Sequence, residues 1–187
     1  MPTTTNWGLQ YPSPSDAPNG PSQISALAST VDTALESRKS LYVRKTGDTA
    51  RSSTTTHADD PHLTLTVAAS AVYELDCGLY YVSSSQTAGD FKAQFSAPSG
   101  AALQAGVYTF AAASTAATDD LVTCITLTTS MSCGVVLTAD PYNPCQVSGL
   151  LTTSSAGTFK VQWAQNASSA TATTLKANSY MILRRVA

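Results

Sequence analysis

Residues 73–81 read YELDCGLYY, and the apolar side chains of this stretch fall on every second position. Successive side chains of a β-strand point to opposite faces of the sheet, so this alternation predicts a strand with one buried face. Tyr73 and Tyr81 are the first and last residues of the apolar face, while Glu74 and Asp76 lie on the other face. The stretch therefore predicts a strand that belongs to the core of a sheet.

The same alternation recurs along the chain from residue 41 onward. The alternating stretches are residues 63–68, 91–95, 121–127, 159–164 and 180–186, and turn-forming residues separate them at 87–90, 98–100, 118–120, 140–144 and 154–157. Short strands at this spacing are typical of antiparallel sandwiches and jelly rolls. We expect a mainly β protein, with a jelly-roll-like antiparallel β-sandwich over residues 41–187 whose interior holds Phe91, Phe95, Phe159 and Trp163.

Residues 1–20 are predicted to form an extended arm, because prolines recur through this segment and push the residues before them toward extended geometry. The arm nevertheless carries Trp7, Leu9 and Tyr11. Large apolar side chains that cannot be buried within such a segment favour docking onto another polypeptide. The alternative is a tail whose aromatic residues have no partner.

Residues 21–40 are predicted to contain one short amphipathic α-helix, with its best pattern over residues 22–38. Ile24, Leu27, Val31 and Leu35 recur at spacings of three and four and draw one apolar stripe. A helix this short is marginal in water on its own. We expect the stripe to pack either on the β domain or against two further copies of itself around a threefold axis.

The composition of the chain excludes several function classes. Charged residues make up 12% of the 187 residues, about half the usual share. The net charge is −2 and the basic residues are scattered, which disfavours nucleic-acid binding. The sequence opens without a secretory signal, and its weakly polar stretch 101–117 carries too many polar residues to span a membrane. We therefore expect synthesis in a cytoplasm and no membrane insertion.

The four cysteines are Cys77, Cys124, Cys133 and Cys145. None forms a close Cys-x-x-Cys pair, which disfavours a zinc site. Cytoplasmic synthesis favours free buried thiols, and a later move to oxidising surroundings leaves one disulfide open. The spacing does not select its pair.

Two stretches carry a resemblance to a known group of proteins. The first is Asn6-Trp7-Gly8-Leu9-x-Tyr11-Pro12-x-Pro14, followed by Pro21 and the short helix; the second comprises Val43–Thr46, Ser52–Thr56, Asp59–Leu65, Gly157–Asn166 and Lys176–Tyr180. These stretches resemble virion surface proteins of phages that infect actinobacteria, known as minor tail, tail-fibre-like or capsid decoration proteins. The resemblance implies a displayed β module, commonly trimeric, that is held by its N-terminus and has no catalytic residues.

Residues 57–62 form the sharpest polar cluster, with His57 and His62 flanking Asp59, Asp60 and Pro61. Two imidazoles and two carboxylates could bind a divalent metal. The same residues suit a turn entering a strand, in which an Asp side chain caps backbone amides, and we expect this arrangement and no metal site.

Catalytic machinery is not apparent in the sequence. There is no Gly-x-Ser-x-Gly motif, and only the two histidines could act as a general base. Glu74 and Asp76 share a strand, Asp119–Asp120 suits a turn, and nothing close in sequence would activate Cys124 or Cys133. We expect no enzymatic activity and no cofactor.

Tyr80, Tyr81, Tyr108 and Tyr142 could stack on sugars, although alternation places Tyr81 in the core. The sequence therefore leaves two hypotheses. In the first, the chain is a homotrimeric phage structural protein on the virion surface, made in the bacterial host cytoplasm and anchored by its arm to the major capsid protein or to tail proteins. In the second, it is a carbohydrate-binding adhesin or host-receptor-binding module that recognises a cell-surface glycan.

Overall fold

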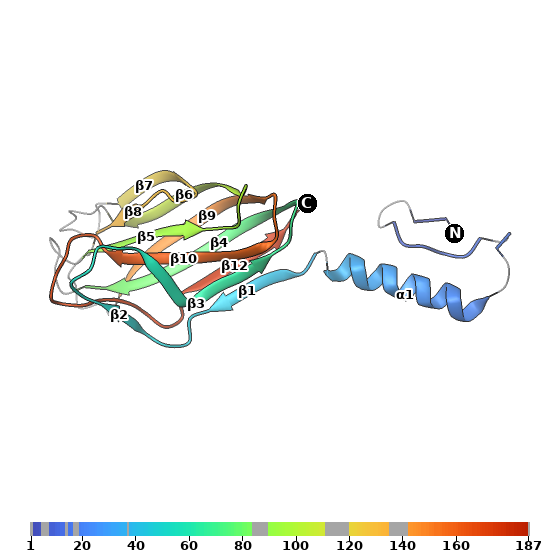
Figure 1. Ribbon diagram of the computed structural model, residues 1–187, viewed down its shortest axis with the longest axis horizontal. Helices are drawn as coiled ribbons and strands as arrows, with labels where there is room; N and C mark the ends of the chain where they lie inside the picture. Colours follow the sequence, from blue (N-terminus) through green and yellow to red (C-terminus); the bar gives the residue numbers. More distant parts are fainter. Residues whose placement is uncertain are drawn as a thin grey trace. The chain divides into compact units, whose positions relative to one another are not determined.

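The computed structural model of the chain describes residues 2–4, 8–13, 15–16, 19–36, 38–83, 90–110, 120–134 and 142–186. The chain divides into two compact units, Met1–Lys39 and Ser40–Ala187. The first unit contains helix α1 (Gly20–Glu36), and the second contains the strands (Figure 1). The protein is mainly β, as the sequence predicts.

Helix α1 begins after Asn19, whose Oδ1 accepts a hydrogen bond of 3.4 Å from the backbone N–H of Ser22. Asparagine is a favoured residue at this capping position. Pro21 lies in the first turn, where its missing N–H removes no helical hydrogen bond. The prediction of one helix near the N-terminus is confirmed, with the helix starting and ending two residues earlier than residues 22–38.

The described residues before the helix turn back on themselves. Thr3 and Gln10 form an isolated antiparallel bridge, and the N–H of Tyr11 donates to the carbonyl of Pro2 at 3.0 Å. Gly8 stands at the bend with φ of +63°, a conformation that glycine adopts without strain. The described residues 2–4 of the arm therefore pair with residues 8–11.

The second unit is an antiparallel β-sandwich, which confirms the predicted fold. Its strands are β1 (Ser40–Arg44), β2 (Thr49–Arg51), β3 (Ala58–Val67), β4 (Ala71–Val82), β5 (Phe91–Ser96), β6 (Ala102–Phe110), β7 (Asp120–Thr126), β8 (Met131–Cys133), β9 (Asn143–Thr153), β10 (Gly157–Gln165), β11 (Thr173–Leu175) and β12 (Tyr180–Arg185). The 8-stranded sheet has the order β1-β12-β4-β9-β6-β7, with β11 joining β4 to β2, and the 4-stranded sheet has the order β3-β10-β5-β8.

The core lies between the two sheets and is built from the alternating residues. In β4, Tyr73, Leu75, Cys77, Leu79 and Tyr81 are all buried, as their spacing predicts. The aromatic residues expected inside are fully buried and stack: the ring centroids of Phe95 and Phe159 lie 5.2 Å apart, and those of Tyr81 and Phe91 lie 4.6 Å apart. Offset or stacked rings at these distances stabilise a core beyond their burial alone.

Two predicted turns are wrong in part. Asp59, Asp60 and Pro61 belong to strand β3, which continues from Ala58 to Val67. Asn143 and Pro144 are the first residues of β9, because Asn143 pairs in register with Tyr81 of β4. The predicted turn over residues 98–100 falls in a turn, and the predicted turn over residues 154–157 begins with bends at Ser154 and Ser155 and ends at Gly157, the first residue of β10. Residues 84–89, 111–119 and 135–141 lie outside the described part.

Candidate functional site

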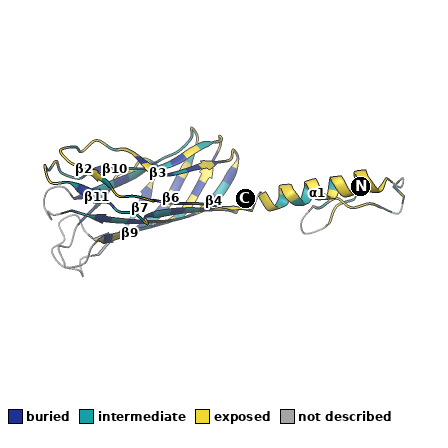
Figure 2. Cartoon of the chain, turned by 90° about the horizontal axis from the view of Figure 1, so that it is seen from below, coloured by how far each residue is buried: buried dark blue, intermediate teal, exposed yellow. Residues whose placement is uncertain are grey.

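The apolar stripe of α1 is exposed. The exposed fraction is 70% for Ile24, 37% for Leu27 and 68% for Leu35, and Val31 is half-buried. All residues of α1 are described and none of them is buried, as Figure 2 shows. The four side chains line one shallow groove along the helix. The structure thus places them together on one face, and their role in oligomerisation stays a prediction.

The helix has few features that would stabilise it alone. It has no acidic residue in its first turn and no basic residue in its last turn, so the helix dipole is not compensated there. Thr30 Oγ1 donates to the carbonyl of Ala26 at 2.7 Å, and Thr33 Oγ1 donates to that of Ser29 at 2.8 Å. Such side-chain bonds to the preceding turn slightly destabilise a helix. A helix of this kind depends on packing of its apolar face.

Two of the three predicted anchoring residues, Leu9 and Tyr11, lie in the described part of the arm. Tyr11 is 43% exposed, and Leu9 is half-buried with its backbone N–H bonded to Thr4 Oγ1 at 3.0 Å. Trp7 lies outside the described residues. The arm therefore presents at least one exposed aromatic ring, and docking through Trp7, Leu9 and Tyr11 stays a prediction.

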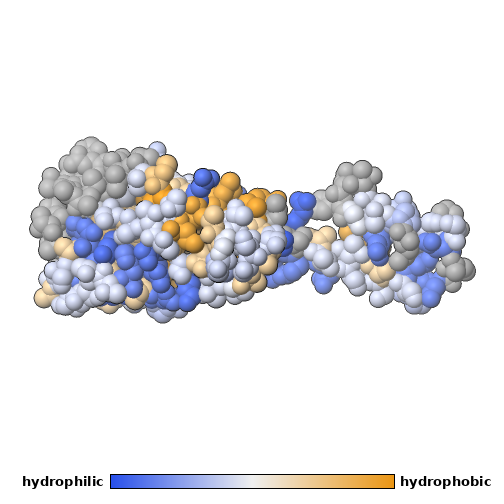
Figure 3. All heavy atoms as spheres, turned by 45° about the horizontal axis from the view of Figure 1, so that its top comes forward, coloured by the Kyte–Doolittle hydropathy of each residue, from blue (hydrophilic) through white to orange (hydrophobic). Residues whose placement is uncertain are grey.

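Among the residues whose side chains the structure describes, the outer face of the 8-stranded sheet carries no charge over β6, β7 and β9. The described outward side chains there include Gln104, Tyr108, Cys124 and Leu150, with Tyr108 62% and Leu150 50% exposed. A groove of about 540 Å³ runs between these strands, and Figure 3 shows hydrophobic residues gathered on the side of the domain where β6 and β7 lie. A charge-free, partly apolar surface of this kind suits contact with another protein.

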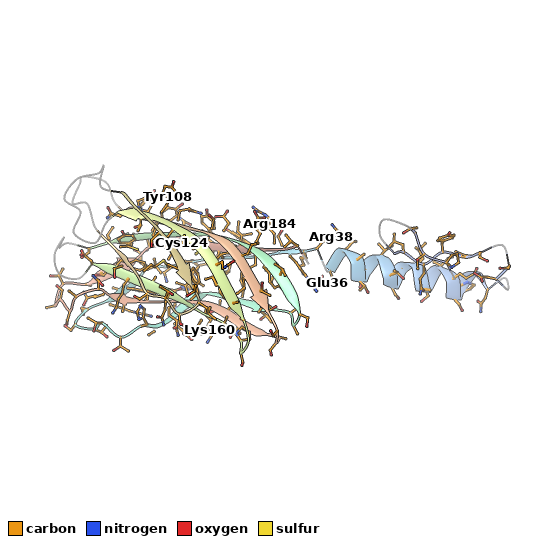
Figure 4. The ribbon with its side chains drawn as sticks, turned by 90° about the horizontal axis from the view of Figure 1, so that it is seen from above. Glu36, Arg38, Tyr108, Cys124, Lys160 and Arg184 are labelled. Atoms are coloured by element: carbon orange, nitrogen blue, oxygen red, sulfur yellow. The ribbon has the colours of Figure 1, made fainter. Side chains whose placement is uncertain are left out.

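Charged side chains form ion pairs elsewhere on the sandwich surface. Arg184 of β12 pairs with Glu74 of β4 at 3.2 Å on the outer face of the same sheet. On the 4-stranded sheet, Lys160 Nζ lies 2.6 Å from Asp59 Oδ2. Figure 4 shows Tyr108 and Arg184 on one side of the sandwich and Lys160 on the other. The uncharged surface is therefore a local feature of β6, β7 and β9.

A row of residues crosses four strands next to this surface. Tyr180, Gly78, Gln146 and Tyr108 are neighbours in register on β12, β4, β9 and β6. A Cβ atom at Gly78 would lie 2.5 Å from the Tyr180 ring, so glycine lets the ring rest against the sheet. Asp76 Oδ1 accepts a hydrogen bond from Gln146 Nε2 at 2.5 Å and one from the Tyr180 hydroxyl at 3.4 Å.

The tyrosines considered for sugar stacking fall into two groups. Tyr81 is fully buried in the core, as alternation predicts. Tyr142 is 49% exposed, and its ring centroid lies 5.3 Å from that of half-buried Tyr80, with Tyr108 exposed on β6. Three of the four rings are thus accessible, whereas the fourth is a packing residue.

The histidines of the polar cluster contact different partners. His57 Nε2 lies 3.3 Å from Ser130 Oγ, and burial together with the charges of Lys92 and Arg51 lowers its pKa. His62 Nδ1 lies 3.2 Å from Lys45 Nζ. Within the described residues, no group of three or more potential ligands is placed to hold a metal ion.

The buried contacts of Lys45 and Arg51 were not predicted from the sequence. Lys45 is fully buried, and its Nζ lies 2.7 Å from Oδ2 of buried Asp60. The guanidinium of Arg51 stacks on the Trp163 ring at 4.2 Å and donates to the carbonyls of Ala58 and Asp59. The partners in both clusters are distant in sequence, so local patterns did not reveal them.

The cysteines are all free thiols in the structure. Cys77, Cys133 and Cys145 are buried, whereas Cys124 is exposed on the outer face of β7. Burial raises the pKa of Cys77, and a hydrogen bond from Cys133 together with burial raises that of Cys145. Raised pKa values keep these thiols protonated and unreactive. In the described part of the chain, no helix has the length and apolar character needed to cross a membrane.

The solved structures that are similar to this chain include two weak neighbours. No family model and no curated protein matches the sequence. The tripod (BppUct-A-L) from the baseplate of bacteriophage Tuc2009 aligns with 94% of this chain and 97% of its own chain, at 10% identity and a TM-score of 0.30. A structure of the infectious bursal disease virus Gt strain aligns with 79% of this chain and 40% of its own, at 9% identity and a TM-score of 0.20. Alignments at these scores do not establish a common fold, so the function is argued from the residues of this chain.

Proposed function

We propose that the chain is a non-enzymatic structural protein of a bacteriophage particle, present as a homotrimeric module on the virion surface. The observation that carries the proposal is the exposed stripe of Ile24, Leu27, Val31 and Leu35 on a helix that has no buried residue. Burial of each of these side chains contributes about 1.5–3 kcal/mol, which is enough to stabilise a helix that is marginal alone.

The geometry of the stripe suits a short parallel bundle around a threefold axis. Ile24 and Leu35 are eleven residues apart, which corresponds to three helical turns, so the stripe runs nearly parallel to the helix axis. In a cyclic assembly of identical copies, each apolar stripe is buried against its neighbours in the same way, and no stripe is left exposed. The homotrimer is thus a closed assembly.

The uncharged surface of β6, β7 and β9 supplies a second contact between the copies. Its outward residues Gln104, Cys124 and Leu150 carry no charge that would have to be desolvated. The charged pair Arg184–Glu74 and the opposite face around Lys160 remain in solvent. Copies of the domain therefore meet through the surface whose dehydration costs the least free energy.

Attachment to the particle is assigned to the arm, with Tyr11 as its exposed anchor together with Leu9 and Trp7. The partner is the phage capsid or tail surface, in line with the resemblance of the N-terminal motif. Deleting residues 1–20 tests this assignment, because the shortened protein should stay trimeric but be absent from purified particles. Normal incorporation of the shortened protein would contradict anchoring by the arm. Copy number per particle, from quantitative mass spectrometry, separates capsid decoration from a tail component.

Glycan binding is the second candidate function, favoured by the row that crosses β12, β4, β9 and β6. The Tyr180 ring packs against Gly78 beside the Asp76 carboxylate, and aromatic faces next to hydrogen-bonding groups are typical of sugar sites. Binding of the wild-type protein to host cell-wall glycans, lost in Tyr108→Ala and Tyr180→Ala but kept in Lys160→Ala, would support it. Equal binding by all these variants would contradict it.

A further inference from the structure

Lys45 directs its amino group into the protein interior. It follows the last residue of β1, is fully buried, and has its Nζ 2.7 Å from Asp60 Oδ2. Two further groups hold the nitrogen in place: Thr49 Oγ1 at 2.5 Å and His62 Nδ1 at 3.2 Å. Lys45 Nζ therefore lies beside the Asp60 carboxyl group and within hydrogen-bond distance of the imidazole nitrogen of His62.

The Asp60 carboxyl is surrounded by hydrogen-bond donors. Its Oδ1 accepts the backbone N–H groups of His62 at 2.9 Å and Leu63 at 3.1 Å. Its Oδ2 accepts the indole N–H of Trp163 at 3.2 Å. Donors fixed around a carboxyl group stabilise negative charge that develops on its oxygens when a nucleophile adds to the carbon.

The reacting pair of this cluster is shielded from water, whereas the His62 side chain is one third exposed. Lys45 and Asp60 are 0% and 1% exposed, and the Trp163 ring beside them is fully buried and covered by the Arg51 guanidinium. A buried nucleophile and carboxyl group, with a base beside them and donors for the oxyanion, make up the parts of an acyl-transfer centre. Removal of water from such a site also favours a condensation that releases water.

We propose that Lys45 and Asp60 join in an intramolecular amide bond between the Lys45 side-chain nitrogen and the Asp60 side-chain carbon. A proton passes from the Lys45 ammonium to the Asp60 carboxylate, which leaves a neutral amine and a carboxylic acid. Nζ then attacks Cγ, and the backbone N–H groups of His62 and Leu63 hold the oxyanion. His62 Nδ1 takes the second amine proton and delivers it to the departing hydroxyl. One C–N bond forms, one C–O bond breaks and one water molecule leaves, so no oxidant or cofactor is needed.

The bond would join the two sheets at the start of the β domain. Lys45 follows β1, an edge strand that pairs with β12 in the 8-stranded sheet, and Asp60 belongs to β3 in the 4-stranded sheet. If the chain is anchored by its N-terminal arm, as the proposed function holds, pulling force enters the domain at β1. A covalent link at Lys45 would transfer this force to the opposite sheet. The chemistry itself does not depend on the anchoring.

Intact-mass spectrometry of the denatured full chain tests the proposal. The wild-type protein should weigh less than its sequence by the mass of one water molecule, and a digest should contain one peptide pair joined through Lys45 and Asp60. Lys45→Arg keeps the buried cation but should show its full sequence mass. Asp59→Asn, which alters the neighbouring carboxylate paired with Lys160, should keep the mass loss. The proposal is overturned if folded wild-type protein retains its full sequence mass after long incubation.

The role of His62 has its own readout. In a refolding time course, His62→Ala should slow the appearance of the lighter species by about 100-fold, as loss of a general base does. An unchanged rate would overturn the assignment of His62 as the proton acceptor. Failure of these tests leaves the trimer and anchoring proposals untouched, because those depend on α1 and the arm.

Discussion

The Sγ atom of Cys133 lies 3.7 Å from the Sγ atom of Cys145, and the two residues belong to different sheets of the sandwich. Cys133 ends β8, at the edge of the 4-stranded sheet, and Cys145 lies near the start of β9 in the 8-stranded sheet. Both thiols are buried. The contact therefore places a pair of buried thiols at the boundary between the sheets.

Thiol labelling distinguishes the exposed cysteine from the buried ones and reports on the second trimer contact. In the native protein, Cys77, Cys133 and Cys145 should resist an alkylating reagent because they are buried. Cys124 should be protected in the trimer and should react in a monomeric variant, since it lies on the uncharged surface. Peptide mapping after labelling measures this pattern, and unfolded protein, in which all four should react, is the control. Equal labelling of Cys124 in trimer and monomer would contradict the contact.

Glycine is required at residue 149 but not at residue 106. A Cβ at Gly149 would overlap the carbonyl oxygen of Gln104 and lie 2.5 Å from Ala105 Cα, so β9 and β6 would have to move apart. Gly149→Ala should lower the free energy of unfolding by about 1–3 kcal/mol. Gly106→Ala, with nothing within 4 Å of its Cβ, should change it by less than about 0.5 kcal/mol. Denaturant unfolding measures both, and equal effects would contradict the packing described.

Asp90 should make the protein less stable at neutral pH than at acidic pH. Burial raises the pKa of this carboxyl to about 6, and its Oδ1 has no hydrogen-bond partner among the described residues. Between its ordinary pKa of 3.8 and about 6, the folded state holds more protons than the unfolded state, so this contribution to stability falls as pH rises. Asp90→Asn should therefore raise the free energy of unfolding by about 1–2 kcal/mol at pH 7 and hardly change it at pH 4.

Asp59 should show the opposite pH dependence of stability and therefore serves as a control for Asp90. Hydrogen bonds from Lys160 and Gln162 lower the pKa of the Asp59 carboxyl, so its stabilisation is present at neutral pH and is lost as pH falls through that lowered pKa. Asp59→Asn should therefore destabilise the protein slightly at pH 7 and much less at acidic pH. Unfolding curves of both variants at several pH values measure the two trends. Trends of the same sign would contradict the assigned environments.

The strands could be predicted from the sequence because each core strand buries one face only. Tyr73 to Tyr81 alternate between the core and the outer face along β4, and the helix stripe repeats with helical spacing. Both patterns are local, so periodicity alone revealed them. The interior aromatic residues followed from the same alternation.

The start of β3 could not be predicted in this way. Pro61 suggested a turn, but β3 is an edge strand, and its register with β10 shifts between Lys160 and Gln162, so no ladder hydrogen bond is lost at the proline. Asp60 is buried because Lys45, fifteen residues earlier, neutralises it. Neither the bulge nor the partner is visible in the local sequence.

One candidate surface could be predicted from the sequence and the other could not, because only the first depends on a local pattern. The stripe of α1 is contiguous on one helix and was found. The row of Tyr180, Gly78, Gln146 and Tyr108 depends on the register of four strands that are far apart in the chain. Of this row, only Tyr108 was considered for ligand binding from the sequence, and there it was grouped with Tyr80, Tyr81 and Tyr142.

The stripe variants test how the copies associate. Leu27→Glu with Val31→Glu places charge in the apolar groove of α1 and should dissociate the assembly, with the circular dichroism of the β domain unchanged. Ser29→Glu, on an exposed position outside this groove, should leave association intact. Equal behaviour of the two proteins would argue against association through the stripe.

The absolute mass of the wild-type protein in solution, measured by light scattering coupled to size-exclusion chromatography, tests the central claim most directly. A homotrimer predicts about 58 kDa, three copies of the 19.4 kDa chain. A mass of 19.4 kDa at micromolar concentration would contradict the account, because the stripe of α1 would then be exposed on a monomer.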